Sequence, residues 1–480
     1  MGEPRLIEIS PVTRVEGHGK VTVHLNAQNE VDEARFHIVE FRGFERFIRG
    51  RLMWEVPVIV QMLCGICPVS HHLAAAKAMD VIAGVDQLTP TAEKMRRLMH
   101  YGQIMQSHVL HFFHLAAPDL LFGFDAAAEK RNIFEVIKEQ PELGRRAILM
   151  RKFGQEIIEA TAGKKIHGTG AVPGGINRNL PVERRDHFLS LIDEMVDWAQ
   201  DAVKLARDYT MDNGELVSNF GSFPSNYMSL VRESDGALDL YHGNLRALSS
   251  TGDPIFDQVP YTRYHELLVE DVRSWSYMKF PFIKALGPEA GWYRVGPLAR
   301  MNTVSHIDTP LAHAAHQDLK TVTNGAPNHS SLANHWARMI EVLHCIEKIR
   351  ELLNDPDLQG SDLIQTGERR EEGIGVIEAP RGNLIHHYRV DEHDQVTYCN
   401  LIVSTTHNNE GMNRAVKEVA VSHLSGQDKI TEGMLNHVEV AIRAYDPCLS
   451  CATHALGQMP LLVELFDSGG QLLERRSRAA

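Results

Sequence analysis

Long apolar segments are absent from this 480-residue chain. No run approaches the ~18–20 apolar residues of a membrane span, so the sequence predicts no transmembrane helix. The opening residues MGEPR lack the basic stretch followed by an apolar stretch that marks a secretory signal, and we expect no signal peptide. Internal repeats and low-complexity segments are also missing, which argues against solenoids and biased disordered chains.

Positive charge is in short supply. Lysine and arginine total 49 against 62 aspartates and glutamates, which gives a net charge of −13. An acidic chain lacks the basic surface of a nucleic-acid-binding protein and the polybasic anchor of a protein held on anionic membranes. Hydrophobic residues at 43% and charged residues at 23% are typical of a globular protein.

The pattern of apolar residues predicts an α+β fold. Short β-favouring runs fill the first 40 residues, and a second hairpin is expected over residues 383–404. The helical segment that starts at Pro90 is apolar on most faces, which is typical of a helix buried in a bundle. Helical periodicity recurs at about residues 131–162, 181–210, 310–322, 329–355 and 408–425.

From these segments we expect a buried long-helix bundle core, with strand-rich flaps at the N-terminal region and near the C-terminus. Residues 215–305 are rich in Gly, Ser, Pro and Tyr, and we expect them to be irregular. The length alone allows about three domains, but no linker composition separates them. The sequence therefore predicts one large mixed unit.

Cysteine is scarce, with only six in the chain, which excludes a disulfide scaffold. Four of the six form two Cys-x-x-Cys pairs at opposite ends of the sequence. Cys64 and Cys67 lie in CGICPVSHH, and Cys448 and Cys451 lie in DPCLSCATH. Four thiolates are soft donors that suit Zn, Fe or Ni better than Mg or Ca.

These pairs leave three interpretations open: a structural zinc site, a catalytic or redox metal, and dithiol chemistry. Zinc knuckles usually pair within ~12–20 residues, whereas these pairs are separated by most of the chain. Neither pair lies in an evident βαβ unit of the thioredoxin type. The two remaining cysteines, Cys345 and Cys399, are isolated in apolar segments, and we expect them to be ordinary buried thiols.

The two motifs together resemble the large subunit of nickel–iron hydrogenases. Five further segments agree in the family's order: SPVTRVEGHG at 10–19, FRGFE at 41–45, VPGG at 172–175, EAPRG at 378–382 and LIVSTTHNN at 401–409. The resemblance therefore covers nearly the whole chain. The CGICPVSHH form, the short length and the absence of a signal are similar to the cytoplasmic NAD-reducing branch, so the resemblance implies a cytoplasmic enzyme.

If the chain follows the family, Cys64, Cys67, Cys448 and Cys451 hold nickel. Cys67 and Cys451 also bridge to an iron that carries carbon monoxide and cyanide, while Cys64 and Cys448 are terminal nickel ligands. The implied reaction is reversible heterolytic cleavage of H2, in which the metals act as the electrophile.

The resemblance also supplies candidates for the base that takes the proton. Terminal Cys448 is the first candidate, and Glu16 in RVEGHG, which matches the family's proton-relay glutamate, is the second. Arg381 in APRG matches an arginine held over the metals. Because an arginine stays protonated, we expect it to be an electrostatic partner. Without the resemblance, Glu16 would be a solvated carboxylate at a strand end and Arg381 a turn residue in an ion pair.

A magnesium ion is implied as well, with Glu45, the backbone carbonyl of Leu401 and His454 as ligands. Mg2+ prefers oxygen and retains several waters, so this small set suffices. Without the resemblance, Glu45 would be a surface charge. The residues expected around the metals are His71 beside a bridging sulfur, Ser404 or Thr405 beside a cyanide, and Asp446 two residues before Cys448.

The chain departs from the family pattern in three places. Met62 stands where an arginine is frequent, and Ser107 stands where membrane-bound members carry an aspartate. Ser404 occupies the place of a proline. None of these changes removes an expected metal ligand.

The implied partners follow from the cysteine count. Two isolated cysteines are too few for a four-cysteine iron–sulfur cluster, so electrons leave through another chain. The resemblance implies a diaphorase module and a small iron–sulfur subunit, which together would hold the iron–sulfur clusters, FMN and NAD. No GxGxxG opens a helix after a strand, and GTGAVPGG at 168–175 fits poorly, so we expect no NAD site in this chain.

The C-terminal residues complete the expectations. In the family, an endopeptidase cuts after the histidine that corresponds to His454, once nickel-insertion proteins have loaded the metal. We therefore expect residues 1–454 to form one unit and residues 455–480 to be a removable extension. The alternative is an ordinary C-terminal strand, because LLVELF has that pattern.

Three other functions remain open. One is a hydrogenase with a different acceptor, such as NADP, a deazaflavin or ferredoxin. Another is a non-catalytic relative in a respiratory complex, although such relatives typically lose the cysteine pairs. The third is a zinc-stabilised binding protein.

Overall fold

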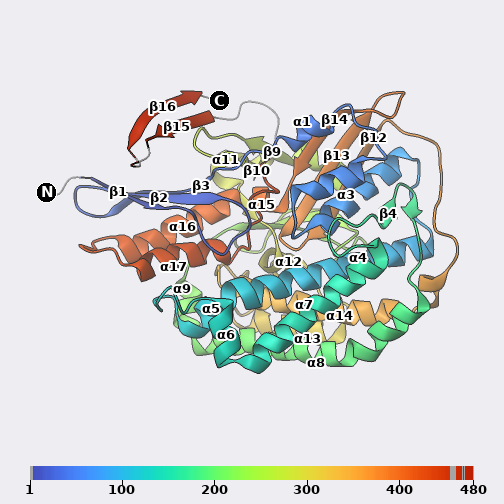
Figure 1. Ribbon diagram of the computed structural model, residues 1–480, viewed down its shortest axis with the longest axis horizontal. Coiled ribbons are helices and arrows are strands. Elements are labelled where there is room, and N and C mark those ends of the chain that lie inside the picture. The colour runs from blue at the N-terminus through green and yellow to red at the C-terminus, as the bar shows by residue number, and fades with distance from the viewer. Residues whose placement is uncertain (1–3, 454–460, 468, 470, 479–480) are drawn as a thin grey trace.

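The computed structural model describes residues 4–453, 461–467, 469 and 471–478. Its lower half in Figure 1 is a bundle of long helices: α4 (Pro90–Val109), α7 (Pro141–Ala162), α8 (Val182–Asp212) and α14 (Ala333–Leu353). Helix α4 packs against both α7 and α14, and α14 packs against α8. The helical segment after Pro90 is buried on nearly all sides, which confirms the predicted bundle core.

The helix boundaries differ from the predicted ones where proline intervenes. Residues 131–162 form two helices, α6 (Ile133–Glu139) and α7, because Pro141 starts a new helix at its first position. At its other end α4 runs through a π-helical segment, Leu110–Ala116, into α5 (Ala117–Phe122).

The N-terminal flap is an antiparallel sheet of β1 (Arg5–Ile9), β2 (Gly19–Leu25) and β3 (Val31–Ile38). Helix α16 (Asn409–Leu424) packs against β3, and α17 (Glu432–Arg443) packs against α16. Apolar side chains of the sheet and these helices form one core cluster. Segments from the two ends of the chain therefore lie side by side (Figure 1).

The predicted hairpin at 383–404 is confirmed as β13 (Gly382–Val390) and β14 (Val396–Ile402), and β12 (Glu372–Ala379) adds a third antiparallel strand. Helix α3 (Pro68–Ile82) lies directly on β12. A Cβ atom on Gly375 would lie 2.2 Å from the carbonyl oxygen of Ala74. Only glycine allows this close approach of helix and strand.

The expectation of an irregular segment at 215–305 is wrong. This region holds a four-stranded sheet, ordered β11 (Tyr293–Arg294), β6 (Asn226–Val231), β7 (Asn244–Leu248) and β8 (Pro254–Val259), and a pair of β9 (Leu268–Asp271) and β10 (Phe280–Ile283). Its strands are short and separated by turns, which weakens the two-residue periodicity that identifies strands.

The remaining elements are short or peripheral. The short helices are α1 (Phe44–Ile48), α2 (Val56–Ile59), α9 (Gly214–Asn219), α10 (Tyr264–Leu267), α11 (Gly287–Ala290), α12 (Pro297–Thr303), α13 (Pro310–Thr321) and α15 (Ser404–His407). The 3-10 helices are Val60–Leu63, Tyr261–Arg263, Lys284–Leu286 and Pro356–Gln359. The other strands are β4 (Ala171–Val172), β5 (Gly175–Ile176), β15 (Leu461–Phe466) and β16 (Leu472–Arg478). LLVELF at 461–466 is thus a strand, paired with β16. Within the described residues, no helix combines the length and apolarity needed to cross a bilayer.

Buried histidines in the bundle predict instability in acid. Burial lowers the pKa of His100 and His344 to about 4 and that of His335 to about 3. The folded chain keeps these rings neutral, whereas the unfolded chain protonates them below about pH 6.5. Stability is therefore complete above that pH and falls as the pH drops toward 4, by up to about 3 kcal/mol for each ring.

The urea midpoint, measured between pH 7.5 and 4.5, tests this expectation. The midpoint should be constant above about pH 6.5 and fall steadily below it. Replacing the exposed His393 with glutamine should leave the curve unchanged. A midpoint that stays constant down to pH 5 contradicts the prediction.

Candidate metal centre

The two Cys-x-x-Cys pairs meet in the interior. The sulfur atom of Cys448 lies 3.2 Å from that of Cys64 and 3.0 Å from that of Cys451, and the sulfur of Cys67 lies 3.5 Å from that of Cys451. All four ligand atoms lie within 4.8 Å of one another. The four side chains are buried, and none forms a disulfide.

Backbone hydrogen bonds and the start of α3 fix the position of each cysteine pair. Cys67 immediately precedes α3, whose first residue is Pro68, and the amides of Ile66 and Cys67 donate to the sulfur of Cys64. The positive end of the α3 dipole favours a thiolate at this position. On the other pair, the amide of Cys448 donates to the hydroxyl of Thr405 at 3.0 Å.

The cluster fits a metal group. A tetrahedral metal with ~2.3 Å bonds separates its sulfurs by ~3.8 Å, close to the spacings found here. The neighbouring thiols, Cys448 first among them, hold the pKa of the Cys64 thiol well below its usual value. Burial raises the pKa of Cys448 and Cys451 well above it. A metal would remove these protons, because thiolates are the ligating form.

A small cavity lies beside three of the cysteines. It is bounded by Cys67, Cys448 and Cys451 and otherwise mainly by apolar side chains and hydroxyls. The other lining residues are Ser70, His71, Ala379, Pro380, Arg381, Leu384, Val403, Ser404 and Thr405. A structural zinc site with four thiolates needs no such space, because its coordination is closed.

Glu16 reaches the cluster from the loop between β1 and β2. Its Oε2 accepts from the sulfur of Cys448 at 3.0 Å, and Ser450 binds the carboxylate through its amide and its hydroxyl. Burial, and then the charge of Cys64, raise the pKa of Glu16. The next residue, Gly17, has φ +85°, and a Cβ there would lie 2.8 Å from Leu449. Glu16 is therefore a mostly buried carboxylate fixed by hydrogen bonds, rather than a solvated one.

Arg381 lies at the turn between β12 and β13. Its Nη2 donates to Asp446 Oδ1 at 2.8 Å, its Nε donates to the Asp446 backbone carbonyl, and its Nη1 lies 3.3 Å from the hydroxyl of Ser107. Burial alone would lower the pKa of Arg381, but Asp446 and the thiolates, Cys448 first among them, raise it well above its ordinary value. Arg381 is a turn residue in an ion pair and also a fixed cation beside the cysteines.

Three other residues expected near the metals, His71, Ser404 and Thr405, line the same cavity. The hydroxyl of Ser404 donates to the carbonyl of Gly382 at 2.8 Å. His71 Nδ1 lies 3.1 Å from His386 Nε2, and a bond from His71 to a bridging sulfur stays a prediction. The neighbouring His72 belongs to the core, where it links Pro57 to the amide of Ala171.

Two of the three expected magnesium ligands lie together. Glu45, on α1, is 3% exposed rather than a surface charge, and its Oε1 accepts from the amide of Leu401 at 2.8 Å. His454 lies outside the described residues. No motif pointed to Glu270, a partly buried carboxylate paired with Lys279 at 3.2 Å, whose pKa is raised by burial and by Glu45.

Two further residues of the site, Ser450 and Arg338, were not predicted from the sequence. Ser450 lies inside the second cysteine motif, so its closeness to the site could have been inferred. Arg338, on α14, carries no local motif, and only the tertiary fold places it near Asp446.

A buried four-thiolate centre flanked by a carboxylate and a fixed guanidinium defines a metalloprotein with a reactive pocket. Sequence comparison gives the family. The profile described as nickel-dependent hydrogenase matches residues 42–133 and 147–454, and a HoxL-like profile matches residues 6–41. The chain belongs to the nickel-dependent hydrogenase family, so the resemblance expected from its motifs is confirmed.

Individual relatives agree with this assignment. The chain is 49% identical to the NAD-reducing hydrogenase HoxS subunit beta of Cupriavidus necator, over 99% of this chain and 100% of that protein. It is 40% identical to a subunit of the F420-non-reducing hydrogenase of Methanothermobacter thermautotrophicus, over 98% and 99% of the two chains. A solved NAD+-reducing NiFe-hydrogenase in its H2-reduced state superposes with a TM-score of 0.92 at 57% identity, covering 94% of this chain and 99% of that one.

Proposed function

We propose that this chain is the hydrogen-activating subunit of a NAD-reducing nickel–iron hydrogenase that works in the cytoplasm. The observation that carries the proposal is the four-cysteine centre with Glu16 bonded to Cys448. Identity of 49% and 57% to NAD-reducing proteins, against 40% to an F420-non-reducing one, favours NAD over the other acceptors.

The cysteines divide into two roles in this proposal. All four would hold nickel, and Cys67 and Cys451 would also hold iron, while Cys64 and Cys448 would be terminal nickel ligands, as in the family pattern. The cavity lies beside Cys67, Cys448 and Cys451. The bound metals would supply the electrophile that polarises H2 and accepts its electrons.

The residues of the chain then handle the proton. The sulfur of Cys448 is the first base, and the proton passes to Glu16 Oε2, 3.0 Å away, a distance suited to direct transfer. Glu16 is partly accessible whereas Cys448 is buried, so the carboxylate leads outward from the centre. Arg381 keeps its proton and stabilises negative charge on the thiolates.

Carbon monoxide and cyanide on the iron belong to the same proposal. The apolar wall of the cavity would surround them, and a hydroxyl would donate to a cyanide. The proton of Ser404 is donated to the Gly382 carbonyl, whereas Thr405 uses its oxygen to accept from Cys448. Among the described contacts the Thr405 proton is uncommitted, which favours Thr405 as the donor.

The magnesium proposal rests on the buried contact between Glu45 and Leu401. The Glu270 carboxylate adds to the negative charge near Glu45, and Lys279, 3.2 Å from Glu270, offsets part of it. Magnesium held by Glu45, the Leu401 carbonyl and His454 would add further positive charge to this acidic site.

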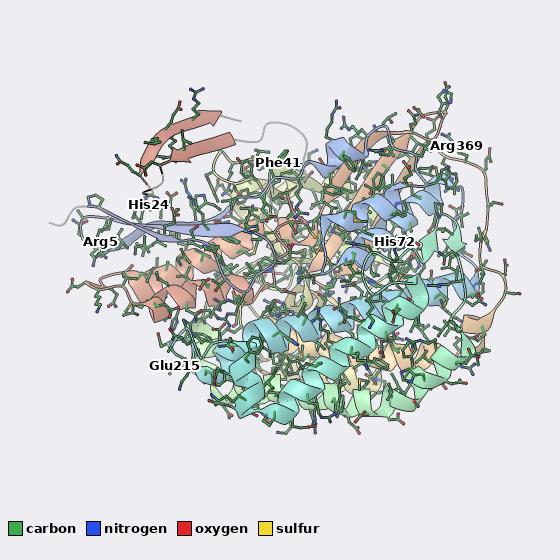
Figure 2. All side chains as sticks on the ribbon, in the orientation of Figure 1. Arg5, His24, Phe41, His72, Glu215 and Arg369 are labelled. Atoms are coloured by element: carbon green, nitrogen blue, oxygen red, sulfur yellow. The ribbon has the colours of Figure 1, made fainter. Side chains whose placement is uncertain are left out.

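Electrons require a partner. Large apolar side chains are exposed along residues 39–62, just before the first cysteine pair, including Phe41, Trp54 and Met62 at 52%, 52% and 50% exposure. Figure 2 shows Phe41 near the upper rim of the molecule. Exposed apolar side chains gathered in this way mark a protein interface. We propose that residues 39–62 bind the small iron–sulfur subunit, and that a diaphorase module further along the complex holds FMN and NAD.

The variant Trp54→Glu tests this contact. Loss of co-purification of the small subunit with this variant would support it.

Residues 455–480 are proposed to be removed by the maturation endopeptidase after nickel insertion, leaving residues 1–454 as the mature unit. The described hairpin β15–β16 pairs only with itself among the sheets of the described residues. Its removal therefore breaks no sheet of the described fold.

Metal analysis of the purified complex, with intact mass measured on the same sample, tests the proposal. Nickel and iron near one each per chain, with a mass ending at His454, is the expected result. Zinc near one without nickel, in a chain trimmed at His454, would restore the structural zinc site and overturn the hydrogenase assignment. NAD-dependent H2 oxidation by the same sample would identify the acceptor.

A further inference from the structure

Arg338 is a buried cation that lacks an ion pair. It lies on α14 with no measurable exposure. Its Nη1 and Nη2 make long hydrogen bonds, 3.4 and 3.2 Å, to the carbonyls of Asn334 and Ala444, and its Nε has no partner. No carboxylate of the described residues lies within ion-pair distance of its guanidinium.

Arg294, at 2% exposure, also lacks a carboxylate but makes hydrogen bonds of 2.8 to 3.2 Å to carbonyl oxygens and the Tyr227 hydroxyl. Three other arginines of the core are treated differently, because each is as completely buried as Arg338 and contacts a carboxylate directly. These contacts join Arg96 to Asp80, Arg300 to Glu341 and Arg443 to Asp119. Because an unpaired buried charge is strongly destabilising, the environment of Arg338 must supply negative charge in some other way.

The nearest source lies toward the cysteines. Burial lowers the pKa of Arg338 to about 10, and the largest opposing influence is the charge of Asp446. Asp446 Oδ1 is occupied by Arg381, while Oδ2 has no hydrogen-bond partner in the described residues. The flanking rings of His111 and His335 are stacked at 5.7 Å with their pKa values lowered by burial, so they add no negative charge.

The charge of Asp446 thus acts on two guanidiniums, on Arg381 by direct contact and on Arg338 at longer range. The carbonyl that Arg338 holds, Ala444, lies on the short segment that leads through Asp446 to Cys448. Ser107, at 3.3 Å from Arg381, contributes no charge. Glu341 also acts on Arg338 but is already paired with Arg300 at 2.6 Å. The thiolates of the centre, whose charges act on Arg381, become permanently charged when they ligate metal.

We infer that Arg338 is a positioning residue for the metal centre: it fixes the segment before Cys448, orients Asp446 and through it Arg381, and supplies the positive charge that balances the metal-bound thiolates. This inference rests on the proposed function. It predicts that the charge of residue 338, rather than its packing, tunes the electron density of the metals.

Three variants of the holoenzyme test this: Arg338→Met, which removes the charge but keeps the stem, the neutral Arg338→Gln, and the charge-preserving Arg338→Lys. The readouts are nickel and iron content and the infrared stretching frequencies of the carbon monoxide and cyanide on the iron. Loss of a nearby positive charge leaves more electron density on the iron, so the bands should shift to lower frequency in Met and Gln and return toward wild type in Lys. Turnover should fall ~10–100-fold in the neutral variants.

Met339→Leu, a packing change one residue along α14, is the matched control and should leave the bands unmoved. Unshifted bands in a nickel-loaded Arg338→Met protein overturn the inference. Metal loss in both neutral variants with Lys fully loaded supports it, whereas metal loss in all three overturns it. Wild-type protein without nickel and iron would instead overturn the proposed function, so the two failures are distinguishable.

Discussion

Cys451→Ser is expected to yield a chain that lacks nickel and iron and does not oxidise hydrogen. The Cys451 sulfur lies 3.0 Å from that of Cys448 and 3.5 Å from that of Cys67, so it completes the four-sulfur cluster and borders the cavity beside it. A serine hydroxyl is a hard donor that keeps its proton at neutral pH, and it replaces the soft thiolate poorly for nickel.

Removing a residue that only hydrogen-bonds to a metal ligand typically lowers activity ~10–100-fold. Because Cys451 is expected to be a ligand itself, the activity of Cys451→Ser should fall further, to background. Cys345→Ala provides the matched control, since Cys345 is also a fully buried thiol but lies in the helical bundle. The control should retain metals and activity. A Cys451→Ser protein with full nickel and turnover would remove this residue from the centre.

Parts of the fold could be predicted because their patterns are local. The helix after Pro90 is apolar on most faces and is buried, and the strands at 383–404 flank a polar turn and form β13 and β14. By contrast β12, with sequence EGIGVIEA, contains two glycines that weaken a strand signal. Those glycines make room for α3, a contact that exists only once helix and strand are packed.

The metal site could be predicted from sequence only where its residues belong to short motifs. Four cysteines in two pairs indicate a soft metal wherever the chain brings them together. The charged residues around the cysteines do not form such a motif. Arg381 and Asp446 are distant in sequence, and Arg338 is an isolated arginine on a helix. Their pairing depends on the packing of α14, the β12–β13 turn and the segment after α17, which no single window of sequence contains.

Glu16→Gln is expected to stop proton transfer while leaving the metals in place. Glutamine has the same shape and can still accept from the Ser450 amide, which donates to Glu16 at 3.2 Å. It cannot take the proton from the Cys448 sulfur, 3.0 Å away. Loss of a positioned general base costs typically ~100- to 10,000-fold, so both H2 oxidation and exchange of D2 with water should fall by that amount.

Exchange is the more telling measurement, because it requires proton movement but no electron acceptor. Nickel and iron content should equal that of wild type, which separates this variant from Cys451→Ser. Glu8→Gln, on the exposed face of β1, is the matched control and should exchange normally. If Glu16→Gln exchanged D2 at the wild-type rate, the proton would leave through another group. Glu16 would then have only a structural role, in which its carbonyl accepts from the Leu449 amide and holds the N-terminal loop against the second cysteine pair.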